Sequence, residues 1–473
     1  MKKVCLIPFF LVMMCSVTGQ DVSRKLAAAV DLLENDLQMS SAIVSIYVMD
    51  ESTGRLVYEH NSRYALAPAS TQKLFTAAAA FEILGRSYRY KTSLNIYEDI
   101  VSAGSRKSGM IGVEGSGDPS LGSWRYASTK KEKLLADWAE SINAIAPGYQ
   151  WRSIYVKDFV SSSNLAIPEG YIWQDIGNYY GAGTSYFNWN ENQYDLTLKS
   201  GGPGAAVTIS KVNPMQKQVL FRNELKAGAP GTGDNAWIFA APGSKEAILK
   251  GTIPPSQTAF SISGSMPDPG YTFALDLKDA VTGNKQDDSE LFISSRDGKI
   301  KDSIFSKTRL LTTVTHQSPS LDSLVYWFLR KSVNLYGEAF LKKIGEEKSG
   351  QFATEIGVDA LNEFWSSKGI DPAAMQIQDG SGLSPQNRVT TKALVQVLKY
   401  SRGREWFPAY YAALPEYNGM KMKSGSIGGC RAYAGYHNSK AGKKYVFAII
   451  INNYTGSAGE VVRKMYKILD NLK

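Results

Sequence analysis

The sequence is poor in cysteine and histidine, with three residues of each among 473. Cys5 and Cys15 stand in an apolar N-terminal run that follows Lys2 and Lys3, and we expect this run to be removed as a secretory leader. Only Cys430 then remains, which excludes an internal disulfide from the mature chain. The three histidines are dispersed and no His-Glu-x-x-His motif is present, so we expect no metal site.

Long apolar runs are also missing. After the leader, predicted to span residues 1–19, the most apolar run is KKYVFAIIIN, which is far shorter than the roughly 18 residues of a membrane helix. We therefore expect no transmembrane segment in the mature chain. We expect an exported protein of the periplasm or cell envelope, soluble or peripheral. Lipidation at Cys15 is disfavoured, because Met13 and Met14 stand where a small residue should precede the cysteine.

The formal net charge is +9, and it falls to about +7 when Lys2 and Lys3 are removed. The basic residues are scattered and form neither a run nor an arginine-rich stripe, which argues against a nucleic-acid partner. A mild basic bias would suit an anionic polymer of the envelope. An ordinary soluble surface is the simpler interpretation of the charge alone.

The two ends of the chain predict one shared architecture. Residues 22–38 have the spacing of an amphipathic helix and 42–60 predict a β-hairpin, while 429–453 predict a second hairpin followed by a terminal helix. We expect these ends to close a single antiparallel sheet flanked by helices, an α+β domain made of residues 20–87 and 291–473. Residues 88–290 carry many short β-type runs between Gly, Pro, Ser and Asn, and predict a β-rich insertion of one or two small domains.

Ser70 and Lys73 stand at the start of a helix that is rich in small residues, within PASTQKLFTAAAAF. A spacing of three places both side chains on one helical face, so Oγ and Nζ can form a hydrogen bond. The pair is either a helix cap with a solvated charge or a nucleophile with its base. The second interpretation requires burial or a neighbouring cation to depress the pKa of Lys73, and the apolar helix predicts burial.

Two later motifs favour the nucleophile. Ser332 and Asn334 stand in RKSVNLYGEAF, and Lys423 begins the run Lys-Ser-Gly-Ser just before the penultimate predicted strand. The Ser332 hydroxyl can pass a proton between Lys73 and a departing amine, and the Asn334 amide can orient a peptide substrate. Lys423 supplies positive charge for a substrate carboxylate and disfavours protonation of Lys73.

The run that follows Lys423 adds two candidates. Gly425 permits close approach of the backbone. The N–H groups of Ser426 and Ser70 would form an oxyanion hole. This set performs acyl transfer without a metal or a cofactor.

Ser-x-x-Lys, Ser-x-Asn and Lys-Thr-Gly in this order are the signature of penicillin-binding proteins and class A β-lactamases. The chain resembles one branch, the low-molecular-weight class C penicillin-binding proteins, which are D-alanyl-D-alanine carboxypeptidases and endopeptidases of the S13 peptidase group. About 260 residues separate Lys73 from Ser332, matching the long insertion of that family. Further segments similar to family landmarks are GSGDPSLG (115–122), YYGAGTSYFNWNEN (179–192), ISGSMP (262–267), SPSLDSLVYWFLRKSVNLYGEAFLKKIG (318–345) and QDGSGLSPQNRVT (378–390).

The resemblance implies a penicillin-binding-protein/serine β-lactamase-like transpeptidase domain and a serine DD-peptidase. It would cleave D-Ala-D-Ala or D-amino-acid cross-links of peptidoglycan stem peptides through a Ser70 acyl-enzyme, with β-lactams as covalent inhibitors. It also suggests Asp175 and Tyr180 as residues that recognise the free amino end of the peptide side chain. The chain departs from the family at Val333, where a polar residue is usual, and in having serine for threonine at Ser424 and Ser426. Serine keeps the hydroxyl group, so the resemblance still implies that Ser424 takes part in binding the substrate carboxylate.

Two alternatives remain open at this point. A β-lactamase shares the motifs, but the chain is long and lacks a convincing Glu-x-x-Leu-Asn element between the first two of them. A catalytically weak cell-wall-binding protein would need neither the nucleophile nor the two lysines. The sequence does not distinguish carboxypeptidase from endopeptidase, and it does not reveal the stem-peptide residue, the oligomeric state, the leader cleavage site or the effect of Val333 on the rate.

Overall fold

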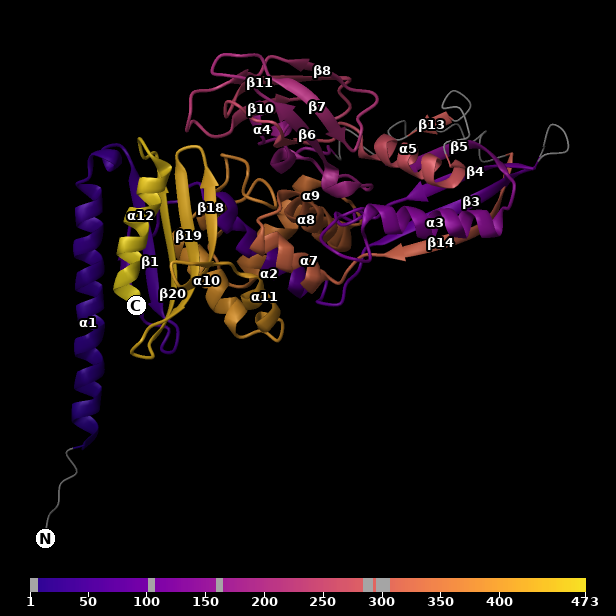
Figure 1. Cartoon of the computed structure of the whole chain (residues 1–473). Helices are drawn as coiled ribbons and strands as arrows, with labels where there is room; N and C mark the ends of the chain where they lie inside the picture. Colours follow the sequence, from indigo (N-terminus) through magenta and orange to yellow (C-terminus); the bar gives the residue numbers. More distant parts are fainter. Residues whose placement is uncertain (1–6, 101–106, 159–164, 284–291, 295–306) are drawn as a thin grey trace, which may run out of the picture. The chain divides into compact units, whose positions relative to one another are not determined.

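The computed structural model describes residues 7–100, 107–158, 165–283, 292–294 and 307–473 (Figure 1). Contacts divide the chain into two compact units. Unit 1 comprises Met1–Ile83, Val325–Ser332 and Val358–Lys473, and unit 2 comprises Leu84–Leu324 and Val333–Gly357. Both units are discontinuous in sequence.

The domain limits predicted above stay a prediction. Residues 333–357, which the prediction assigns to the two-ended domain, group with unit 2 by their contacts. The predicted limit at 290/291 and residues 1–6 of the predicted leader lie outside the described residues. From Ile7 the chain is helical to Glu34 (α1). Among the described helices, none combines the length and the apolar character that crossing a bilayer requires.

Unit 1 is built on one sheet of six antiparallel strands. The central pair joins the two ends of the chain, because Ile43 pairs with Asn452 and Asp50 with Tyr445. The sequence prediction of one sheet closed by the two hairpins is therefore confirmed. In spatial order the strands are β17 (Glu416–Tyr417), β18 (Met420–Ile427), β19 (Cys430–Asn438), β20 (Lys444–Asn452), β1 (Ile43–Asp50) and β2 (Leu56–His60).

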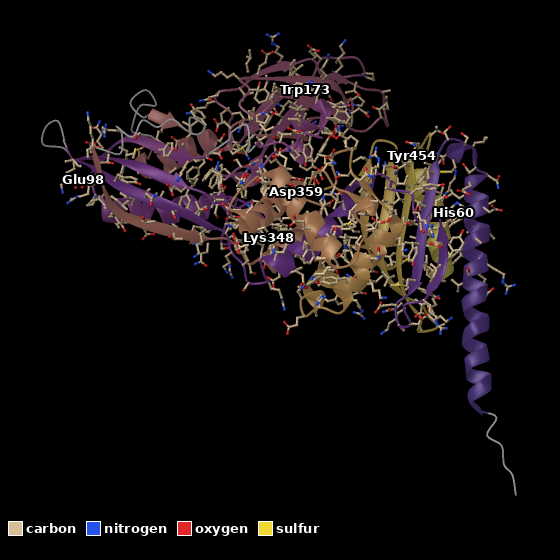
Figure 2. All side chains as sticks on the ribbon, turned by 180° about the vertical axis from the view of Figure 1, so that it is seen from behind. His60, Glu98, Trp173, Lys348, Asp359 and Tyr454 are labelled. Carbon is tan, nitrogen blue, oxygen red and sulfur yellow. The ribbon has the colours of Figure 1, made fainter. Side chains whose placement is uncertain are left out.

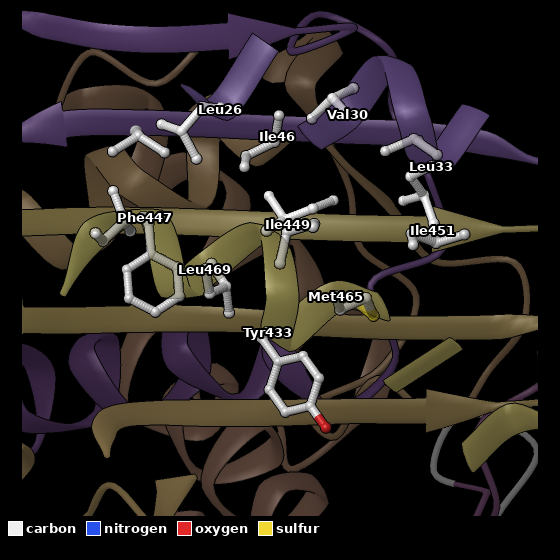
Figure 3. Packing of buried hydrophobic residues seen from close by; sticks show 14 of the residues in the cluster. Leu26, Val30, Leu33, Ile46, Tyr433, Phe447, Ile449, Ile451, Met465 and Leu469 are labelled. Carbon is white, nitrogen blue, oxygen red and sulfur yellow. The ribbon is translucent and has the colours of Figure 1, made fainter. Parts of the chain in front are cut away.

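Helices cover both faces of this sheet. On one face, α1 and α12 (Ala458–Leu469) pack Leu26, Val30 and Met465 against apolar side chains such as Ile449 of β20 (Figure 3). On the other face, α10 (Thr391–Arg402) packs on β1 and β20 and also contacts α2 (Lys73–Ile83). The predicted antiparallel sheet flanked by helices is thus confirmed.

The remaining elements of unit 1 are short or helical. The helix α7 (Leu321–Arg330) begins in unit 2 and ends in unit 1, and α9 (Thr354–Ser367) does the same. The others are the turns η1 (Leu37–Met39), η2 (Ala69–Gln72), η6 (Pro372–Ala374) and η7 (Asp470–Leu472), the helix α11 (Phe407–Ala413), and the pair β15 (Met375–Gln376) and β16 (Arg388–Val389).

Unit 2 is rich in strands, as predicted, but it also contains long helices. Trp138 of α3 (Lys131–Ile145) and Phe273 of α5 (Pro269–Thr282) pack edge to face in the core that these helices share with a five-stranded sheet. The strands of this sheet are β13 (Phe292–Ser294), β5 (Gln150–Lys157), β4 (Ser108–Glu114), β3 (Lys91–Asp99) and β14 (Thr308–Gln317).

Two smaller sheets share a second core that includes Tyr194, Leu196 and Leu249. One sheet contains β10 (Asn235–Phe239), β11 (Glu246–Ile253), β8 (Leu220–Asn223) and β9 (Lys226–Ala227), and the other contains β12 (Phe260–Ser265), β6 (Gln193–Lys199) and β7 (Thr208–Asn213). Unit 2 also holds the short elements α4 (Trp173–Ile176), η3 (Tyr179–Gly181) and η4 (Asn190–Asn192) and the long helix α8 (Asn334–Ser349).

Candidate active site

Ser70 and Lys73 form a direct contact on one turn. Ser70 lies in η2 and Lys73 is the first residue of α2. The Lys73 Nζ donates to Ser70 Oγ at 3.0 Å and to the carbonyl oxygen of Ser381 at 2.6 Å. Lys73 is fully buried, and its Nζ atom stands 5.7 Å from the ring centroid of Phe328. This burial rules out the interpretation of Lys73 as a solvated surface charge.

Contacts to backbone atoms of Ala67 and Pro68 hold the turn that carries Ser70 in place. Asn452 of β20 accepts from the N–H of Ala67 at 2.9 Å and donates to its carbonyl at 3.1 Å, and the Cys430 thiol also donates to that carbonyl. A Cβ atom on Gly425 would lie 2.4 Å from the Pro68 carbonyl oxygen. The close approach expected at Gly425 is therefore present, and it sets β18 directly against the turn.

The residue before Ser70 has a strained backbone. Ala69 has a φ of 46°, in the left-handed region that non-glycine residues seldom occupy. Its carbonyl oxygen would lie 2.1 Å from a Cβ atom on Gly382, so only glycine fits at that position. Strain of this kind persists where the surroundings over-determine it, and it is typical of functional sites.

A buried loop supports Lys73, and this role was not predicted from the sequence. Asp379 is fully buried and accepts from the backbone N–H groups of Ser381 (3.1 Å), Gly382 (2.6 Å) and Ser384 (2.6 Å). Burial raises the pKa of Asp379, whereas the N–H groups of Ser384 and Gly382, the Asn387 side chain and the charge of Lys73 oppose the rise. The carboxylate thereby shapes the loop whose Ser381 carbonyl binds Lys73.

The same loop also binds the start of α2. Gln72 donates to the Asp379 carbonyl at 2.6 Å, and Thr76 donates to the Gly380 carbonyl at 2.7 Å. Within QDGSGLSP, the Gly and Ser content and an Asx-type Asp379 were available signals of a tight turn. They did not reveal that this turn lies beside Lys73.

Lys423 and Gly425 are both buried on β18, and alternation along the strand places them on the same face. Burial, and after it the charge of Lys73, hold the pKa of Lys423 well below its ordinary value. The structure therefore brings the two lysines of the motifs into electrostatic contact. Ser424 and Ser426 alternate to the opposite face, where the Ser424 hydroxyl lies 3.5 Å from that of Tyr417.

The Ser-x-Asn element links α7 to α8. Ser332 has a φ of 57°, which lies in the left-handed region, as does that of Ala69. Val333 is the N-cap of α8 and makes no side-chain capping bond. Asn334 opens the helix, is buried, and donates from Nδ2 to the Tyr180 carbonyl at 2.7 Å.

Asp175 and Tyr180 contact each other in unit 2. The Tyr180 hydroxyl donates to Asp175 Oδ1 at 3.3 Å. Burial raises the pKa of both groups, and for Tyr180 the neighbouring Asp175 adds to the rise. Asn334 thus binds the backbone of the residue whose side chain binds Asp175.

As for metals, no group of three His, Cys, Asp or Glu side chains in the described part of the chain could hold an ion.

Comparison with known proteins relates this geometry to a family. Residues 26–417 match the D-Ala-D-Ala carboxypeptidase 3 (S13) family. A D-alanyl-D-alanine carboxypeptidase of Actinomadura sp. (strain R39) is 24% identical over 464 residues, covering 91% of this chain and 81% of the relative.

Solved structures share the fold. Penicillin-binding protein 4 (dacB) from Haemophilus influenzae superposes with a TM-score of 0.73 at 19% identity, covering 96% of this chain and 98% of its own. The same protein complexed with a β-lactam superposes with a TM-score of 0.68 at 18% identity, covering 96% and 99%. The chain belongs to the D-Ala-D-Ala carboxypeptidase 3 (S13) family and is a serine-type D-Ala-D-Ala carboxypeptidase of the penicillin-binding-protein fold.

Proposed function

We propose that Ser70 is the nucleophile and Lys73 its base in the hydrolysis of D-Ala-D-Ala ends, and of D-amino-acid cross-links, in peptidoglycan stem peptides. The observation that carries this assignment is the 3.0 Å contact between Lys73 Nζ and Ser70 Oγ, with Lys73 fully buried. Ser70 Oγ adds to the peptide carbonyl as Lys73 takes its proton, and the C–N bond breaks as the amine leaves with a proton. Water then hydrolyses the ester and restores Ser70.

Lys423 is proposed to bind the terminal carboxylate of the substrate. In the substrate-free site its pKa is low because it is buried and close to Lys73. An incoming carboxylate would favour the protonated form of Lys423 and form a charge-assisted hydrogen bond with it. Substrate binding and the protonation of the two lysines would then be coupled.

The edge of β18 beyond Lys421, which has no strand partner among the described residues, is proposed to bind the peptide backbone. Its edge partner β17 pairs only with Met420 and Lys421. The Met422 N–H points away from β19, to the Pro415 carbonyl at 3.0 Å. By strand alternation, the N–H groups of Ser424 and Ser426 point to that same edge. This supports a strand-like peptide at the edge, with the N–H of Ser426 and that of Ser70 as oxyanion donors.

The Ser-x-Asn element and the Asp175–Tyr180 pair complete the proposal. Ser332 would relay the proton from Lys73 to the leaving amine, and Asn334 would orient the substrate peptide group. Asp175, with Tyr180, would accept the free amino end of the stem-peptide side chain, because a half-buried carboxylate gains from pairing with a cation. Ser424 is not part of the substrate-carboxylate site, because it alternates to the face of β18 opposite Lys423 and its hydroxyl donates to that of Tyr417 at 3.5 Å.

Export to the cell envelope belongs to the same proposal, because peptidoglycan lies outside the cytoplasm. The basic start and apolar run before Gln20 support a leader. Fractionation of cells that express the full chain tests this directly. Recovery of the uncleaved chain in the cytoplasm would contradict it.

One experiment tests the catalytic proposal against its alternatives. The mature chain and Ser70→Ala are each incubated with a D-Ala-D-Ala peptide and with a fluorescent penicillin. We expect D-alanine release and persistent labelling from the wild type, and neither from the variant. Rapid penicillin turnover would indicate a β-lactamase, and absence of both reactions in the wild type would indicate a cell-wall-binding protein.

A further inference from the structure

Three buried polar side chains lie along one face of α8. Asn334, Glu338 and Lys342 stand at intervals of four residues, so they project from the same side of the helix on successive turns. Glu338 and Lys342 have no exposed surface, and Asn334 is 8% exposed. This polar stripe occupies positions where a buried helix ordinarily carries apolar residues.

Each member of the stripe binds the segment 165–184. Asn334 Nδ2 donates to the Tyr180 carbonyl at 2.7 Å, and the Tyr171 hydroxyl donates to Glu338 Oε1 at 3.0 Å. Lys342 Nζ donates to the carbonyl oxygens of Leu165 at 2.6 Å and Thr184 at 2.9 Å. Lys342 thus binds near both ends of the segment, and Glu338 and Asn334 bind within it.

Burying the charged and polar groups of this stripe costs free energy, because they lose their contact with water. Burial lowers the pKa of Lys342 to about 8, even though Glu338, Asp158 and Glu355 act in the opposite direction. Buried ionic groups are often no more stabilising than apolar residues of the same volume. Their directional hydrogen bonds, in contrast, fix the backbone of a segment that has little regular secondary structure. The segment contains the short helices α4 and η3 and an isolated bridge at Asn178.

We propose that Glu338 and Lys342 are positioning residues for substrate recognition. They hold segment 165–184 so that the Asp175–Tyr180 pair keeps a fixed place relative to Asn334 at the start of the helix. The inference rests on the proposed function of Asp175 and Tyr180 as the site for the amino group of the stem-peptide side chain. Glu338 and Lys342, one and two turns after Asn334 on α8, then determine how precisely this site is positioned.

A pair of matched peptides tests the inference. Both end in D-Ala-D-Ala, and the third residue carries a free side-chain amino group in one peptide and a methyl group in its place in the other. The variants are Lys342→Met, and Tyr171→Phe, which removes a single hydroxyl group and keeps the volume. Lys348→Met is the control, because Lys348 is exposed on the same helix (Figure 2).

For Lys342→Met and Tyr171→Phe, we expect KM for the amino peptide to rise about tenfold while kcat changes less than about threefold. The amino-free peptide and the rate of penicillin acylation should stay within about threefold of the wild type, and Lys348→Met should match the wild type throughout. The ratio between the peptides separates positioning from a general loss of fold, which would slow every reaction alike.

The opposing outcomes are distinct. If both variants keep the wild-type preference for the amino peptide, or if penicillin acylation falls by the same factor as peptide cleavage, the positioning role is wrong. If the wild type itself shows no preference between the two peptides, the proposed function of Asp175 and Tyr180 fails, and the inference fails with it.

Discussion

Replacing Gly425 by alanine should slow acylation of Ser70 by moving the strand that lies against it. The added Cβ would stand 2.4 Å from the Pro68 carbonyl oxygen and 3.1 Å from the backbone nitrogen of Ser70, whereas ordinary contacts begin at 3.4 Å. Both neighbours are backbone atoms, so β18 and the turn must separate by about 1 Å. A displacement of this size at a reacting group costs about a hundredfold in rate, or about 2.7 kcal/mol.

The assay is the second-order rate of labelling by a fluorescent penicillin, measured beside the denaturant midpoint of each variant. Gly428→Ala is the matched control, because Gly428 lies in the turn after β18 and a Cβ there would meet nothing within 4 Å. The control should label at the wild-type rate. If Gly425→Ala labels as fast as the wild type and unfolds at the same midpoint, the close fit of β18 to the turn that carries Ser70 has no catalytic role.

Three further predictions concern other parts of the structure. Val333→Asp should add the capping bond that α8 lacks and raise the free energy of unfolding by about 1 kcal/mol, measured by denaturant titration. Asp379→Ala should leave the loop N–H groups unpaired and slow penicillin labelling by at least about tenfold, because the Ser381 carbonyl loses its place beside Lys73; an unchanged labelling rate would contradict this. The folded-state pKa of Lys342, about 8, lies below its ordinary value, so the unfolded chain binds more protons and stability should rise by about 2 kcal/mol between pH 8 and 9.5 relative to Lys342→Met. Equal pH slopes for the two proteins would show that Lys342 titrates normally in the fold.

The sequence predicts the unit 1 sheet well because its signals are local. Each hairpin has its own β-type strands and its own turn, and each is accompanied by a helix of clear apolar periodicity. Ser70 and Lys73 are three residues apart, so helical spacing alone predicts their contact. The helix α5 was not predicted. Its N-cap Asp268, its first residue Pro269 and its C-cap Gly283 were nevertheless recognisable helix signals in the sequence.

The contacts that hold Ser70 and Lys73 in place could not be predicted in the same way, because they join residues that are far apart in the sequence. Gln72 and Asp379 are 307 residues apart, and no periodic pattern connects them. The left-handed Ala69 and the need for glycine at Gly382 arise only when two distant backbones meet. The polar stripe of α8 could not be recognised from the sequence either. Polar and charged residues at intervals of four are equally typical of an exposed helix face, and only the contacts with segment 165–184 show that this face is buried.

The most direct test of the account is the mass of the protein after exposure to benzylpenicillin, followed by digestion and mapping of the modified peptide. The account predicts one added penicilloyl group, carried by the peptide that contains Ser70, and none in Ser70→Ala. An adduct on any other residue, or an adduct that persists in the variant, would contradict the assignment of Ser70 as the nucleophile.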